Sequence, residues 1–144
     1  YGCALYSLSY HGRCHSAWTF YRESSAIDPY YYVQGANYTD FERQFWYAEE
    51  ASRVLERVYR ECKVPALRQQ ALWMLAKCMQ KRCGEEKPAY LSFSWMDKEA
   101  VDYVNWNVEK NTWLAAFHRE YKGTPYYDAV YQECSYLRMY AGQH

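Results

Sequence analysis

The chain has 144 residues, which suits a single domain that buries roughly two thirds of the surface its unfolded form would expose. Lysine and arginine together number 17, as do aspartate and glutamate, so the formal net charge is zero. Without a basic stripe, binding to nucleic acid or to anionic lipid has no electrostatic driving force. No window approaches ~18 consecutive apolar residues, so we expect no membrane-spanning segment in this piece.

Aromatic residues are abundant, whereas β-branched residues are scarce. There are 18 tyrosines and 6 tryptophans, and Ile27 is the sole isoleucine. Because Val, Ile and Thr favour strands, their shortage predicts an all-α fold class. The first residue is Tyr1 rather than methionine, so we interpret the chain as a piece of a longer protein whose signal peptide or anchor would lie outside it.

The first 38 residues predict an N-terminal helix followed by an aromatic loop. Residues 1–10 are small and apolar enough for a helix, which Gly12 interrupts. Residues 22–38 have no helical period, and Asp28-Pro29 within them favours a turn.

A first helical hairpin is predicted over residues 40–83. Its first helix, 40–62, begins after Thr39, and its second helix, 65–83, begins at Pro65, which fits a first helical turn. Both helices are expected to have one apolar face, with Leu67 and Leu75 on the apolar face of the second. The polar face of the second helix carries Arg68, Gln69, Lys77, Gln80 and Lys81.

A second hairpin is predicted over residues 97–141. The apolar pattern changes phase within 97–121, which fits either one helix with rotating contacts or two helices that meet near Lys110-Asn111. A turn at Lys122-Gly123 separates this segment from a last helix over 125–141.

These elements predict one helical-repeat domain over residues 1–144, in which antiparallel hairpins stack as a fragment of a tetratricopeptide-like (TPR-like) α-solenoid. Four apolar residues on the predicted helix faces are expected to be buried: Leu55, Leu75, Phe117 and Leu137.

Part of the sequence resembles a known family. The run Phe117-x-x-x-Tyr121-x-x-Thr124-Pro125-Tyr126-Tyr127-x-x-Val130 is similar to the helix junction of tetratricopeptide-like repeats in bacterial outer-membrane lipoproteins. Three segments also resemble parts of large uncharacterised helical-repeat proteins of Bacteroidota. They are residues 4–12 (ALYSLSYHG) with Trp18, residues 71–78 (ALWMLAKC), and Tyr126-Tyr127 with Glu133-Cys134-Ser135-Tyr136.

The resemblance implies a helical-repeat protein of the cell envelope, periplasmic or associated with the outer membrane, with this piece near its C-terminal end. The partners of such a protein would be envelope or outer-membrane proteins. The resemblance implies no activity. The chain departs from the tetratricopeptide pattern in two respects: its hairpins exceed ~34 residues, and the Trp-Leu-Gly-Tyr signature is absent.

Residue chemistry favours a protein that is not an enzyme and has no cofactor or metal. His11, Cys14 and His15 are the residues most similar to a zinc site, but a fourth ligand is not apparent. The cysteines on the apolar faces are interpreted as small hydrophobes, and the spacing does not place a base such as His118 beside them. The sequence contains no HExxH or GxSxG motif, no phosphate-binding glycine loop and no dinucleotide-binding fingerprint.

The aromatic surplus is the feature most suggestive of function. Aromatic residues outside the main apolar faces either fill gaps between helices or form a surface for a partner. We predict a non-enzymatic scaffold for protein–protein interaction in an envelope assembly, with a glycan-binding module that uses Tyr and Trp platforms as the alternative. The candidate interaction residues are Tyr30, Tyr31, Tyr32, Tyr90, Phe93, Trp95 and Trp106.

Overall fold

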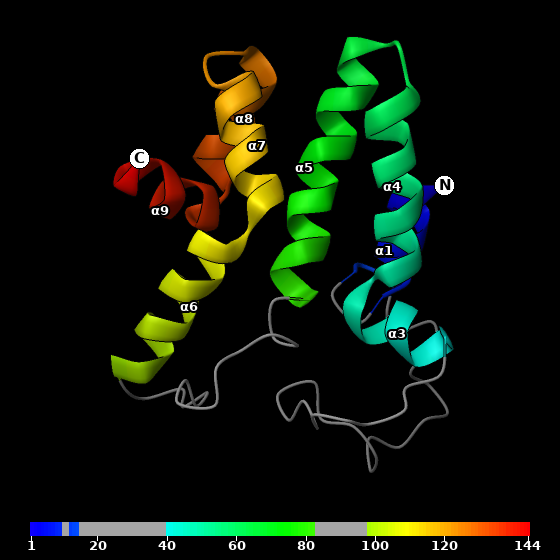
Figure 1. Cartoon of the computed structure of the whole chain (residues 1–144), viewed down its shortest axis with the longest axis horizontal. Coiled ribbons are helices and arrows are strands. Elements are labelled where there is room, and N and C mark those ends of the chain that lie inside the picture. Colours follow the sequence, from blue (N-terminus) through cyan, green and yellow to red (C-terminus); the bar gives the residue numbers. More distant parts are fainter. Residues whose placement is uncertain (10–11, 15–39, 83–97) are drawn as a thin grey trace.

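The computed structural model describes residues 1–9, 12–14, 40–82 and 98–144, and every regular element in these ranges is an α-helix (Figure 1). The predicted all-α class is therefore confirmed for the part described. In chain order the helices are α1 (Gly2–Ser7), α3 (Asp40–Tyr47), α4 (Glu49–Glu61), α5 (Pro65–Arg82), α6 (Lys98–Lys110), α7 (Thr112–Tyr121), α8 (Pro125–Glu133) and α9 (Ser135–Gln143). Among the described residues, no helix is both long enough and apolar enough to cross a membrane.

Helix α5 occupies the centre of the molecule. It runs antiparallel to α4, and α4 and α7 lie on either side of it (Figure 1). Its middle turns are buried all round rather than on one face, because Ala71, Leu72 and Trp73 are buried in succession. Ala71, Leu75 and Cys78 of the predicted apolar face are buried as expected, and Leu72 and Trp73 extend the buried surface beyond that face. Leu67, expected on the apolar face, is 48% exposed.

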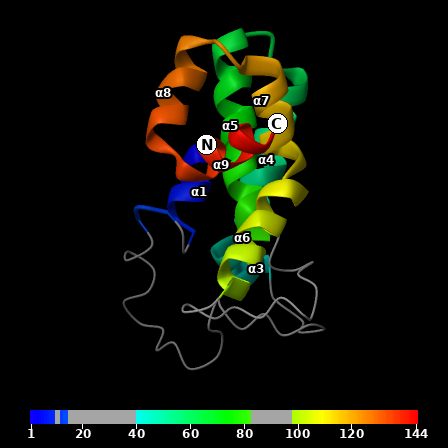
Figure 2. The same ribbon diagram turned by 90° about the vertical axis from the view of Figure 1, so that its left-hand side faces the viewer.

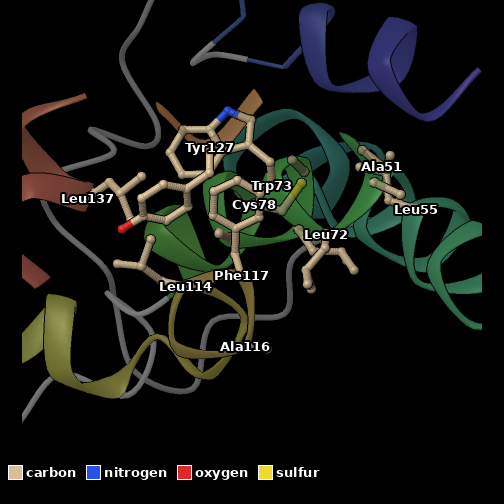
Figure 3. Packing of buried hydrophobic residues seen from close by; sticks show 14 of the residues in the cluster. Ala51, Leu55, Leu72, Trp73, Cys78, Leu114, Ala116, Phe117, Tyr127 and Leu137 are labelled. Carbon is tan, nitrogen blue, oxygen red and sulfur yellow. The ribbon is translucent and has the colours of Figure 1, made fainter. Parts of the chain in front are cut away.

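The core gathers around α5 and α7. Phe117 is fully buried, with its ring centroid 5.2 Å from that of Trp73 and 5.5 Å from that of Tyr127 (Figure 3). Tyr121 and Tyr126 add rings at 5.8 and 6.3 Å from Phe117. The expected burial of Leu55, Leu75, Phe117 and Leu137 is confirmed.

Two glycines allow close approach or a sharp turn. A Cβ on Gly2 would lie 2.7 Å from Leu55 Cγ. Because glycine has no side chain, α1 packs directly against α4 at this position. Gly123 has a positive φ of 85°, which glycine adopts without steric cost in the turn between α7 and α8. Thr124 then caps α8, since its hydroxyl oxygen accepts a hydrogen bond from the Tyr127 amide at 3.2 Å.

Three predicted helical segments are divided, and a polar side chain binds the backbone groups exposed at each break. The expected helix over 40–62 breaks at Ala48, which adopts φ 51°, and Gln44 Oε1 accepts from the Ala51 amide of α4 at 3.1 Å. The expected helix over 125–141 breaks at Cys134, and Arg138 donates to the carbonyls of Tyr131 and Gln132 at 3.0 and 2.6 Å. These contacts satisfy groups that helix ends leave without intrahelical partners.

The third break lies at Asn111 and divides residues 98–121 into α6 and α7, which settles the alternative that the sequence left open. Asn111 is fully buried, accepts from the Leu114 amide at 3.0 Å and donates to the Ala76 carbonyl of α5 at 2.8 Å. One turn earlier, Asn107 donates to the Gln80 carbonyl near the end of α5 at 2.9 Å. Two asparagines one turn apart thus bind two α5 carbonyls one turn apart. We call Asn107 and Asn111 the asparagine pair.

We predict that Asn111→Ala lowers the free energy of unfolding by ~1–3 kcal/mol, because it removes an N-cap and a buried hydrogen bond between helices. Urea unfolding followed by circular dichroism would measure the change. Asn105→Ala is the matched control, since Asn105 lies half-buried on α6, the helix that ends just before Asn111. That control should change stability by less than about 0.5 kcal/mol. Equal effects of the two substitutions would show that Asn111 does not clamp α7 to α5.

Candidate functional site

The predicted aromatic interaction residues fall mostly outside the part of the chain that the structure describes. Tyr30, Tyr31, Tyr32, Tyr90, Phe93 and Trp95 all lie there. Trp106 lies on α6, where it is half-buried, and its ring centroid is 6.2 Å from that of Tyr103. The structure therefore places one of the seven candidates beside another aromatic ring.

The residues considered for metal and cysteine chemistry are similarly divided. Cys14 is exposed, while His11 and His15 lie outside the described residues. Within the described ranges, no group of three or more His, Cys, Asp or Glu side chains is placed to hold a metal ion. Cys78 is buried in the core, as expected for a cysteine on an apolar face, and Cys83 lies outside the described residues.

A pocket of about 170 Å³ lies where α1, α5 and α7 meet the bend between α8 and α9. Figure 2 shows α1, α8 and α9 around the central α5. The pocket combines basic, amide, aromatic and apolar groups from segments far apart in the sequence. Its lining residues are Tyr6, Trp73, Ala76, Lys77, Gln80, Lys81, Leu114, Cys134 and Tyr136.

Two lysines one helical turn apart give the pocket its charge. Lys77 and Lys81 both come from α5 and are half-buried. Burial lowers the pKa of Lys81 below its ordinary value, and the positive charge of Lys77 lowers it further. In the described part of the chain, no carboxylate forms an ion pair with either ammonium group. The two like charges therefore repel each other without compensation from these residues.

Aromatic side chains form the walls beside the lysines. The Lys77 ammonium lies 5.4 Å from the centroid of the Trp73 ring, within the range of a cation–π contact. Burial raises the pKa of Tyr6 to about 12, and the nearby Cys78 contributes in the same direction, so the hydroxyl of Tyr6 stays protonated. The hydroxyl of Tyr136 donates to the Asn107 side chain, which connects the pocket wall to the asparagine pair.

The pocket therefore presents hydrogen-bond donors and positive charge next to apolar surface. None of its described lining residues is a histidine, an aspartate or a glutamate. Such a set can bind and orient a group rich in acceptors. Sequence reasoning missed this site because it assigned Lys77, Gln80 and Lys81 to a solvated face. The signal that could have indicated it is the spacing Trp73, Lys77, Lys81, which places an aromatic ring and two cations on one side of a helix.

His118, the base considered for cysteine chemistry, takes part in the packing of α7 against α8. It is buried, and its Nδ1 forms a hydrogen bond of 2.6 Å with the hydroxyl of Tyr127. Its ring also packs edge-on against Tyr140, with the ring centroids 5.5 Å apart. Burial lowers the pKa of His118, and the charges of Lys122 and His144 lower it further. These contacts give His118 a structural role between the last helices.

Comparison with models of known protein families, with curated proteins and with solved structures found no match to this chain.

We predict that Lys81→Met stabilises the protein by about 0.2–0.5 kcal/mol at neutral pH, because it removes a like charge one turn from Lys77. The folded-state pKa of Lys81 is lowered from 10.5, so the charged form is what the fold disfavours. The gain should therefore shrink as the pH rises through the folded-state pKa towards the unfolded value. Thermal unfolding at several pH values would measure it. Lys63→Met, at an exposed lysine of the α4–α5 connection, is the control and should give no such gain. A loss of stability in Lys81→Met at neutral pH would contradict the prediction.

The pKa of His118 gives a second, independent prediction. A nuclear magnetic resonance (NMR) titration of the imidazole should give a pKa below the ordinary value of 6.5. Lys122→Gln should raise that pKa without restoring 6.5, because burial is the larger cause. Since the unfolded chain binds the proton more readily, stability should fall as the pH drops from 6.5 through the folded-state pKa. A measured pKa at or above 6.5 would show that the ring is open to water.

Proposed function

We propose that this chain is a non-enzymatic helical scaffold that holds a partner protein in an assembly of the cell envelope. In this proposal the hairpins α4–α5 and α7–α8 are units of a TPR-like α-solenoid that belongs to a longer protein. The order of packing supports the solenoid, because α5 contacts both its own hairpin partner α4 and the first helix of the next hairpin, α7. The envelope location rests on the family resemblance of the sequence.

The observation that carries the proposal is the pocket between α1, α5, α7 and the α8–α9 bend. Stacked helical units form binding surfaces from residues of several units, and this pocket is assembled in that way. Its donors and ring faces can hold an acceptor group in a fixed orientation. Cation and ring are already in contact, since Lys77 lies over Trp73.

One observation favours the alternative function, a glycan-binding module. Tyr103 and Trp106 are half-buried neighbours on α6, with their rings tilted by 30°. Aromatic faces that remain accessible can stack on sugar rings, because Tyr and Trp combine an apolar ring with a polar group.

The scaffold proposal predicts that a photo-reactive amino acid at Gln80, which lines the pocket, crosslinks to the same protein in every repeat of the experiment in the native cells. The same amino acid at Gln132, exposed on α8, is the matched control and should not yield that product. Mass spectrometry would identify the product, and fractionation of the cells would test its envelope location. The same protein crosslinked from both positions would count against the pocket as the contact.

The glycan alternative has its own readout. Oligosaccharides should then quench tryptophan fluorescence, and Trp106→Phe should reduce that quenching. Quenching by oligosaccharides together with no protein crosslink from Gln80 would replace the scaffold proposal with the glycan-binding one.

A further inference from the structure

We propose that the pocket is a carboxylate site, which takes the acidic side chain of an aspartate or glutamate that the partner protein presents. The inference rests on the proposed function for the identity of the partner, and on the chemistry of the pocket for the group that is bound. Its basis is the juxtaposition of Lys77, Lys81 and Gln80 beside Trp73 in one cavity.

The charges of the pocket favour an anion. Lys77 and Lys81 bring two positive charges to one side of a half-buried cavity, and no described carboxylate pairs with them. An anion between the two ammonium groups replaces their repulsion with two attractive interactions and accepts charge-assisted hydrogen bonds from both. Gln80 lines the same wall, and the side chain of a glutamine carries an amide donor.

The size of the pocket selects a group as small as one side chain. Its volume of about 170 Å³ is below the ~300–1,000 Å³ typical of sites that enclose a whole small-molecule ligand. An aspartate or glutamate side chain fits such a space while the rest of the partner stays outside.

The apolar part of the lining favours a carboxylate on a hydrocarbon stem over a bare inorganic anion. Trp73, Ala76 and Leu114 are buried apolar residues of the wall. They provide contacts for methylene groups, which phosphate and sulfate lack. The pocket therefore matches both ends of an acidic side chain, the charged oxygens at the lysines and the stem at the apolar wall.

The experiment is an NMR titration of the whole chain, in which the lysine side-chain signals are followed. The probe is the peptide acetyl-Ala-Glu-Ala-amide, and the matched neutral peptide acetyl-Ala-Gln-Ala-amide is its control. The glutamate peptide should shift the signals of Lys77 and Lys81 with saturation, while the signal of Lys63 stays constant. The glutamine peptide should bind at least about tenfold more weakly, because it cannot pair with the charges.

Variants of the lysines connect the shifts to the pocket. Lys77→Gln and Lys81→Gln should each weaken binding about tenfold or more, as expected for the loss of one charge-assisted contact. Lys77→Arg keeps both the charge and a contact with the Trp73 ring, and should bind within a few-fold of the parent. Lys63→Gln should have no effect. Circular dichroism would check that each variant is folded. Failure of folded Lys77→Arg to bind the glutamate peptide would count against the site.

The outcomes separate this inference from the proposed function. If phosphate binds with saturation and the glutamate peptide does not, the carboxylate assignment is wrong. If the crosslink from Gln80 persists unchanged in Lys77→Gln and Lys81→Gln, the scaffold remains supported and the carboxylate inference is overturned. If the glutamate peptide binds at both lysines but no protein crosslinks from Gln80, the site chemistry is supported and the scaffold function is overturned.

Discussion

The asparagine pair is the constraint on which the arrangement of α4–α5 against α6–α7 depends. Apolar packing between α5 and α7 is strong but permits small slides, because dispersion contacts have little directionality. The amide of Asn111 allows no such slide, since it must reach the Ala76 carbonyl while its oxygen caps α7. Asn107 repeats the contact one turn away, at the Gln80 carbonyl near the end of α5. The relative register of the hairpins is thus set by hydrogen bonds within an apolar core.

The same network reaches the candidate site. Tyr136 forms part of the pocket wall and donates to Asn107, which in turn binds the Gln80 carbonyl. Gln80 itself lines the same pocket. The groups that fix the register of the helices therefore also position one wall of the cavity, so the shape of the pocket is a property of the assembled fold.

Local pattern was enough to predict the helical class, the helix that begins at Pro65 and the turn at Lys122-Gly123, because each depends on neighbouring residues. It failed at Ala48 and Cys134, where apolar periodicity continues through a break in the backbone. Those breaks are stabilised by side chains such as Gln44, which also donates to the Leu5 carbonyl of α1 at 2.9 Å. A contact between residues 39 positions apart leaves no trace in a helical period. The pocket escapes sequence reasoning for a related reason: the helical period places Lys77 and Lys81 on a solvated face, whereas in the fold α1 and α9 contribute Tyr6 and Tyr136 to the same cavity.

The cluster of rings around Phe117 gives the protein a built-in optical reporter. Trp73, Tyr121, Tyr126 and Tyr127 surround it in fixed orientations, two tilted, one edge-on and one stacked. Rings held asymmetrically give near-ultraviolet circular dichroism, which disappears when side-chain packing loosens even if the helices persist. Because Trp73 lies in both the ring cluster and the pocket wall, we expect its signal to respond to the packing of the core and to the occupancy of the pocket. A single tryptophan thereby connects the integrity of the fold with the state of the site.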